Sequence, residues 1–268
     1  MNTILYEVED GVGTITLNRP QTKNAIDPDM AEALSAVLAG IKRDPSVRAV
    51  VLTGAGGNFS AGGDVRAMGA RGPRTPEERR EGIRPFQRIA VELHALDRPV
   101  IAAVDGVAFG AGMSLLLLCD MVLVSDRARL CMVFQRVGLI PDLAALYTLP
   151  RVVGVQRAKE LILSAREVGA QEACALGLAM EVVHPDALQD RAAAVARSLA
   201  GASPVAVALV KSVLQANPSI DTLLELEASG QAIAGSSGYA QEAMRRFAAK
   251  EAPQFQWQAS RAEGNPHA

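Results

Sequence analysis

This chain has little net charge, few cysteines and few aromatic residues. Its 268 residues include 27 Lys and Arg against 29 Asp and Glu, which leaves a formal charge of −2 and no general attraction to nucleic acid. The three cysteines, Cys119, Cys131 and Cys174, have no histidine close by in the sequence. We therefore expect reduced, buried thiols in a cytoplasmic protein, without disulfides or a catalytic cysteine.

Long hydrophobic runs, metal-binding clusters and nucleotide-binding motifs are also lacking. Met1–Glu7 has neither a basic start nor an apolar core, which argues against a secretory signal. The longest uncharged stretch, 106–119, falls short of the roughly 20 residues that span a bilayer. His94 and His184 have no further ligand at metal-binding spacing, and neither GxGxxG nor a P-loop is present. The sequence thus predicts no membrane partner, no metal and no redox cofactor.

Apolar residues make up 49% of the chain, and their spacing predicts an α/β fold. Residues 4–8 and 12–17 alternate around Asp10-Gly11, which is typical of a hairpin. Asp27 and Pro28 suit the cap and first position of a helix. Apolar runs at 49–53 and 100–104, separated by a helical pattern at 85–96, predict parallel strands buried on both faces. Further strands are expected at 121–124 and 179–183, and further helices at 155–164 and 170–176.

Three other segments carry weaker patterns. From Asp186 onward the chain is predicted to be helical, with helix caps at Ser203 and Asp221. Met68–Glu81 is charged and predicts a mobile surface loop or a frayed helix. Its arginines either form a solvated face or, because they follow a glycine-rich turn, approach an anionic ligand. Residues 251–268 have little periodicity, and partial disorder is expected there.

Two glycine-rich turns, 59–64 and 106–112, stand out because each follows or trails a predicted buried strand. Small residues at such turns leave backbone N–H groups uncovered, and the helix that follows points its positive end at the same place. Two rigid N–H groups in a dry pocket can stabilise an enolate or tetrahedral oxyanion, each contributing roughly 3–4 kcal/mol. Together the turns predict one oxyanion site, whereas either turn alone would indicate only tight packing.

The order and spacing of short motifs from about Val12 to Lys211 resemble those of the enoyl-CoA hydratase/isomerase family, or crotonase superfamily. The matching segments are 17–20, 23–26, 50–56, 59–64, 98–104, 119–120, 138–141, 149–154, 172–173 and 177–178. The resemblance implies an α/β spiral of repeated ββα units. Residues 1–185 would form the acyl-CoA-binding core. Residues 186–268 would form a helical oligomerisation region that builds a trimer or a dimer of trimers.

The resemblance also implies roles for individual residues. The oxyanion donors fall on Gly63 and on Ala111, where the family usually has Gly and where a methyl group restricts φ. The two carboxylates of a hydratase would fall on Ser114 and Phe134, neither of which suits proton transfer, so ordinary hydration is doubtful. Asp142 stands where several isomerases place a catalytic Asp and an aromatic dehalogenase its nucleophile. Taken alone, Asp142 is better interpreted as the cap of a helix start; the oxyanion turns and the loss of both carboxylates shift the interpretation to catalysis.

By the same resemblance, the acyl-CoA thioester binds along the two turns. Lys23, Ala25 and Ile26 would line the nucleotide end. Ala61, Gly63, Asp64 and Val65 would follow the pantetheine, and Gly110 and Ala111 would meet the thioester. CoA would then carry the substrate and would not act as a cofactor. The leading interpretation is double-bond isomerisation with Asp142 as acid and base; the alternatives are an atypical hydratase and a non-catalytic acyl-CoA-binding protein.

Overall fold

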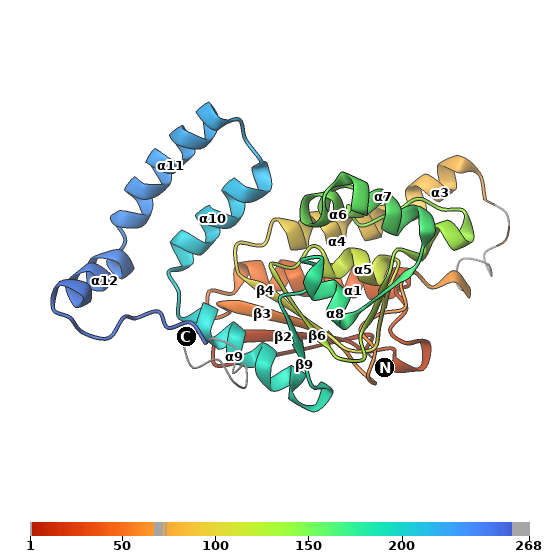
Figure 1. The fold of residues 1–268 in the computed structure, drawn as a ribbon, viewed down its shortest axis with the longest axis horizontal. Helices are drawn as coiled ribbons and strands as arrows, with labels where there is room; N and C mark the ends of the chain where they lie inside the picture. Colours follow the sequence, from red (N-terminus) through yellow and green to blue (C-terminus); the bar gives the residue numbers. More distant parts are fainter. Residues whose placement is uncertain (1, 67–71, 73, 259–268) are drawn as a thin grey trace.

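A six-stranded sheet runs through the body of the molecule in the order β1-β2-β3-β4-β6-β9 (Figure 1). The computed structural model describes residues 2–66, 72 and 74–258. The strands are β1 (Ile4–Glu9), β2 (Val12–Leu17), β3 (Ala49–Gly54), β4 (Val100–Val104), β6 (Met121–Ser125) and β9 (Glu181–Val183). The first pair is antiparallel and turns at Asp10 and Gly11, both with positive φ; the other pairs are parallel. The predicted hairpin and parallel strands are confirmed.

Both faces of the sheet are covered by helices, as the continuous apolar strands predict. In β3, Val50 and Leu52 join the cluster formed with α1 (Pro28–Arg43), α4 (Arg84–His94) and α5 (Ala111–Leu116). The alternate residues Ala49 and Val51 pack with α9 (Leu188–Ala200) on the opposite face. This division follows from the two-residue period of a strand. The core therefore lies in two layers, and the helices α1, α4 and α5 belong to the layer that carries the second glycine-rich turn.

A smaller sheet, β5-β7-β8, joins Val107–Phe109, Arg129–Cys131 and Glu167–Gly169. Its β5 leads directly into α5, so this sheet sets the position of the second glycine-rich turn. The body further contains α3 (Pro76–Gly82), α6 (Ala145–Val153), α7 (Val155–Ser164) and α8 (Ala170–Ala175), with short 3₁₀ turns at Pro20–Thr22, Val133–Val137 and Pro185–Ala187.

Local sequence signals decide where most helices begin. Asp27 caps α1 by accepting a hydrogen bond from the Met30 N–H at 2.8 Å, as predicted. Ser203 likewise caps α10 (Pro204–Ala216). The predicted cap at Asp221 is wrong, because Ser219 caps α11 (Ile220–Gly235) and Asp221 lies in its first turn.

The charged segment 68–81 is in part a helix. Thr75 and Glu78 form a reciprocal capping box at the start of α3, in which no residue is buried. The predicted loop at 68–71 and 73 lies outside the described residues, as do positions 259–268 of the predicted disordered terminus.

Helices α10, α11 and α12 (Gly238–Ala248) project from the body as an arm (Figure 1). None of their side chains is buried, and even the apolar residues Leu214 and Phe247 are 74% and 88% exposed. In the part of the chain that the structure describes, no single helix has the length and hydropathy to cross a bilayer. Only the pair Pro185–Ala200 and Pro204–Ala216, which meet at 104°, reaches that threshold together.

Candidate active site

The two glycine-rich turns lie side by side. The N–H of Ser60 donates to the Val107 carbonyl, and the N–H of Phe109 donates to the Ser60 carbonyl, each at 2.9 Å. Gly62 has φ +94°, and a Cβ there would stand 2.6 Å from the Phe109 oxygen and 3.3 Å from the Ala111 nitrogen. Only glycine permits so close an approach. The pairing of the turns predicted from the sequence is therefore present in the fold.

Two backbone donors remain unused where the turns meet. Among the described residues, neither the N–H of Gly63 nor that of Ala111 donates to a protein acceptor. Ala111 is the first residue of α5, is 1% exposed and has no positive φ, so its methyl group causes no backbone strain. Gly110 before it has φ +50° and donates its N–H to the Cys131 carbonyl at 2.8 Å. Free donors of this kind can hold a developing oxyanion.

The first turn rests on two buried polar side chains that sequence reasoning missed. The Asn24 amide donates to the carbonyls of Ala55 and Asn58, at 2.9 and 2.7 Å. The Ser60 hydroxyl donates to the Asn24 carbonyl at 2.8 Å and accepts from the Gly62 N–H at 3.1 Å. Because buried polar groups need partners, this network fixes the backbone of the turn. The only sequence signal was the polar type of these residues beside the motifs.

The segment predicted to line the nucleotide end is bonded directly to the first turn. The Lys23 carbonyl accepts from the Ala61 N–H at 2.8 Å, and the Ile26 N–H donates to the Gly62 carbonyl at 2.7 Å. The Asp64 N–H completes the ladder by donating to the Ile26 carbonyl at 3.0 Å. The residues predicted to bind the nucleotide and the pantetheine therefore form one continuous strip.

The side chain of Arg19 connects the two segments of this strip. Its guanidinium donates to the Ala25 carbonyl at 2.6 Å and lies 3.1 Å from the Asp27 carboxylate and 3.0 Å from that of Asp64. The Arg19 side chain is 16% exposed, so the pairs are sheltered from solvent. Val65, by contrast, is 60% exposed and lies at the outer end of the strip.

Neither position that replaces a hydratase carboxylate offers a base. Ser114 is fully buried, and its hydroxyl donates to the Gly110 carbonyl at 3.1 Å. Phe134 is 7% exposed, and its ring atom Cζ lies 3.7 Å from the point that a Cβ on Gly110 would occupy. An apolar ring therefore stands beside the second turn.

Asp142 has the properties of a proton-transfer group. Its Oδ1 is buried without a hydrogen-bond partner among the described residues, and burial raises the pKa of Asp142 to about 6. The helix-cap alternative is wrong, because α6 begins at Ala145 behind Ala144, which makes no side-chain cap. The Ala145 N–H instead donates to the backbone carbonyl of Asp142 at 2.9 Å.

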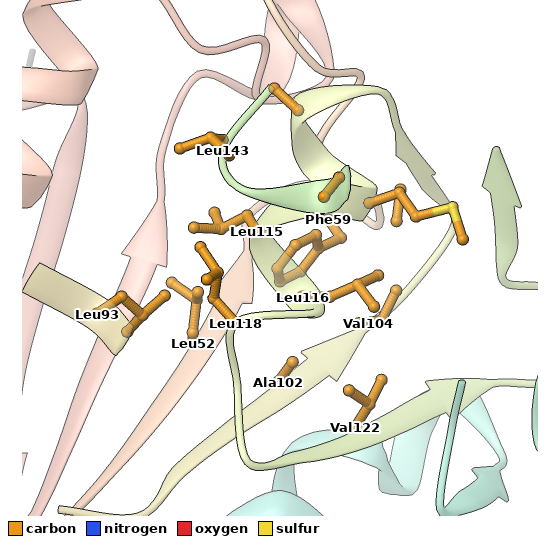
Figure 2. Close-up of a cluster of buried hydrophobic side chains, with 14 of the residues drawn as sticks. Leu52, Phe59, Leu93, Ala102, Val104, Leu115, Leu116, Leu118, Val122 and Leu143 are labelled. Carbon is orange, nitrogen blue, oxygen red and sulfur yellow. The ribbon is translucent and has the colours of Figure 1, made fainter. Parts of the chain in front are cut away.

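The loop that carries Asp142 is anchored in the core. Leu143 and Ala144 both have positive φ, 46° and 60°, a conformation that costs about 1–2 kcal/mol per non-glycine residue. Burial of Leu143, which is 1% exposed, offsets this strain. Figure 2 shows Leu143 among the buried side chains of the cluster that also contains Leu115 of α5. The loop is thereby fixed against the helix whose first N–H is that of Ala111.

Comparisons with known proteins place these features in one family. The model of the enoyl-CoA hydratase/isomerase family matches residues 7–258. The chain is 38% identical over 259 residues to the 1,2-epoxyphenylacetyl-CoA isomerase of Escherichia coli, covering 95% of this chain and 98% of that protein. It is 35% identical over 256 residues to the short-chain-enoyl-CoA hydratase of Clostridium acetobutylicum, covering 93% and 96%.

A solved structure agrees with these sequence relatives. The enoyl-CoA hydratase/isomerase of Cupriavidus metallidurans superposes with a TM-score of 0.93 at 41% identity, covering 98% of this chain and 99% of that one. The family match, the full-length relatives and the superposition lead to one conclusion: this chain belongs to the enoyl-CoA hydratase/isomerase family.

Proposed function

We propose that this chain shifts a double bond in an unsaturated acyl-CoA, with Asp142 as the acid and base. The observation that carries the proposal is the Oδ1 atom of Asp142, which is buried without a hydrogen-bond partner among the described residues, together with a pKa of about 6 that suits proton transfer near neutral pH. The unused N–H groups of Gly63 and Ala111 supply the oxyanion site that such chemistry needs.

The reaction uses one carboxylate for two proton transfers. Asp142 removes a proton from the α-carbon of a 3-enoyl thioester, and the electron pair of the broken C–H bond moves into a dienolate. The N–H groups of Gly63 and Ala111 bind the dienolate oxygen. Asp142 then returns the proton to the γ-carbon, which leaves the conjugated 2-enoyl thioester and restores the carboxylate. CoA enters and leaves as the carrier of the acyl group.

A hydratase is the main rival, because one of the relatives above carries that name. Hydration needs one group that deprotonates water and a second that handles the proton of the α-carbon. The engaged hydroxyl of Ser114 and the ring of Phe134 supply neither, which leaves Asp142 as a single carboxylate. A binding protein without catalysis is the second rival. The raised pKa of Asp142 favours catalysis over binding alone, because buried carboxyl groups with a pKa near neutral are typical of catalytic sites.

Incubation with 3-hexenoyl-CoA and, separately, with crotonyl-CoA distinguishes the three functions. We expect 3-hexenoyl-CoA to become 2-hexenoyl-CoA, with hydration of crotonyl-CoA absent or very slow. Hydration at about 10 per second, an ordinary enzyme rate, would contradict the proposal. Recovery of both thioesters unchanged but bound would favour the binding protein.

The arm is the part of the chain that we assign to self-association. Helices α10 to α12 leave their apolar side chains uncovered within one chain, which supports association as a trimer or a dimer of trimers. We propose that this assembly acts in the cytoplasm on acyl-CoA thioesters.

A further inference from the structure

A cavity of about 200 Å³ lies between the first glycine-rich turn and the Asp142 loop. Its lining includes Asp64, which directly follows Gly63, and Leu139, three residues before Asp142. The oxyanion donors and Asp142 do not line the cavity themselves, but its walls adjoin both, so an acyl group can reach it from the thioester. The cavity is smaller than the roughly 300–1,000 Å³ of pockets for drug-sized ligands, so it suits a short acyl chain.

The wall of the cavity combines apolar and cationic side chains. Ile26, Ile83 and Phe86 supply the apolar part. Arg74, which precedes the cap of α3, and Arg79, inside that helix, supply two guanidinium groups. An apolar lining with a few convergent polar groups is typical of a site that fixes the orientation of a small ligand.

Neither arginine is neutralised within the described part of the chain. The side chains of Arg74 and Arg79 form no ion pair and donate no hydrogen bond to the residues that the structure describes. Of the neighbouring acids, Glu78 accepts from the N–H of the cap Thr75, and Glu81 lies 3.7 Å from Arg84. The two positive charges are therefore available to a ligand.

The two acids that line the cavity do not cancel these charges. Asp27 and Asp64 line it too, but both are paired with the guanidinium of Arg19, at 3.1 and 3.0 Å. The two acids of the lining are thus already paired, whereas its two arginines are not. A negatively charged group would be attracted to Arg74 and Arg79.

We propose that the acyl group of the substrate carries a carboxylate at its far end, and that Arg74 and Arg79 bind it. The substrate class is then a short dicarboxylic acyl-CoA, with the thioester at the two N–H donors and the free carboxylate at α3. This assignment rests on the proposed acyl-CoA function of the same site. Guanidinium groups suit the task because they form charge-assisted hydrogen bonds with carboxylates.

Binding of two saturated thioesters tests the proposal without requiring turnover. Adipoyl-CoA and hexanoyl-CoA have the same chain length and differ by the terminal carboxylate, and isothermal titration calorimetry gives their Kd values. We expect adipoyl-CoA to bind about 10-fold more tightly, as charge-assisted hydrogen bonds at a partly exposed site allow. The Arg79→Gln variant should lose most of this preference. Arg80→Gln, on the same helix but outside the cavity lining, should keep it.

Each other outcome decides the question. Equal Kd values for the two thioesters in the wild-type protein would overturn the proposal. So would a loss of affinity in Arg79→Gln that is equal for both thioesters, because the arginine would then contact the phosphates of CoA. If Arg80→Gln lost the preference for adipoyl-CoA as fully as Arg79→Gln, the preference would come from the general surface charge. That result would also overturn the proposal. A failure to isomerise 3-hexenoyl-CoA would refute the proposed reaction and leave this binding result intact.

Discussion

At the scale of single residues, the ionisation of Asp142 makes the free energy of unfolding depend on pH. Burial raises its pKa from 3.8 to about 6, so between these pH values the folded protein holds a proton that the unfolded chain has released. The free energy of unfolding therefore falls as pH rises through this window and stays lower above it. The gap between the two pKa values corresponds to roughly 3 kcal/mol.

Replacing Asp142 by Asn should stabilise the protein above pH 6. The neutral amide avoids the cost of a buried charge, so we expect a gain of up to about 3 kcal/mol at pH 8 and little change at pH 4. Urea unfolding at both pH values measures it. Asp126→Asn, at an exposed turn residue, is the matched control and should change stability equally at both. An Asp142→Asn variant less stable than the wild type at pH 8 would show that burial of the carboxylate carries no such cost.

Gly62 is the residue on which the approach of the two turns depends. In Gly62→Ala the new Cβ would meet the Phe109 oxygen at 2.6 Å, at a φ of +94°. We expect a loss of about 1–3 kcal/mol in unfolding free energy, together with weaker acyl-CoA binding. Gly40→Ala is the control, because nothing lies within 4 Å of a Cβ there and Ala favours the interior of α1. Equal effects of the two substitutions on melting temperature would argue against the tight approach.

At the scale of elements, prediction from sequence succeeded where a pattern extends over several residues. The hairpin β1-β2, the strands β3 and β4 and the helix α7 were predicted because periodicity and turn residues agree over five or more positions. The strands β5, β7 and β8, of three residues each, were not predicted, whereas the equally short β9 was found within the expected segment 179–183. The start of α6 was not predictable either, because positive φ at Leu143 and Ala144 moves it beyond Asp142.

The loop that carries Asp142 should depend on the anchoring of Leu143. Leu143→Ala removes a side chain that is 1% exposed and packed in the core cluster, so a loss of about 2–4 kcal/mol is expected. Leu146→Ala, three residues later on α6 and 53% exposed before substitution, should cost less than about 1 kcal/mol. Denaturant unfolding of both variants tests this, and similar losses would show that the loop is not held by the core.

At the scale of the whole molecule, the arm should bury its apolar side chains against other copies of the chain. Light scattering at micromolar concentration should give three or six times the chain mass of 28.2 kDa. Leu214→Asp, in the groove between α10 and α11, should weaken this assembly, because a charge cannot be buried cheaply. Leu163→Asp on α7, at a similarly exposed leucine, should not. A wild-type particle of one chain mass would contradict the expectation.

The family and the general path of the ligand could be predicted from motifs, whereas the chemistry of the site required coordinates. Motif spacing marked Gly63, Ala111 and Asp142, and the structure shows unused N–H groups at the first two and a buried oxygen at the third. The support from Arg19 and Asn24 could not be foreseen, because their partners lie up to 45 residues away in the sequence. Whether Asp142 transfers protons stays a prediction.

The most direct measurement is the rate at which wild-type protein and the Asp142→Asn variant convert 3-hexenoyl-CoA to 2-hexenoyl-CoA. The account predicts a kcat that falls by roughly 10²–10⁴-fold in the variant, the usual contribution of a positioned proton-transfer group. It also predicts a Kd for hexanoyl-CoA that changes little, because Asp142 does not hold the CoA. Isomerisation by the Asp142→Asn variant at the wild-type rate would contradict the assignment of Asp142 as acid and base.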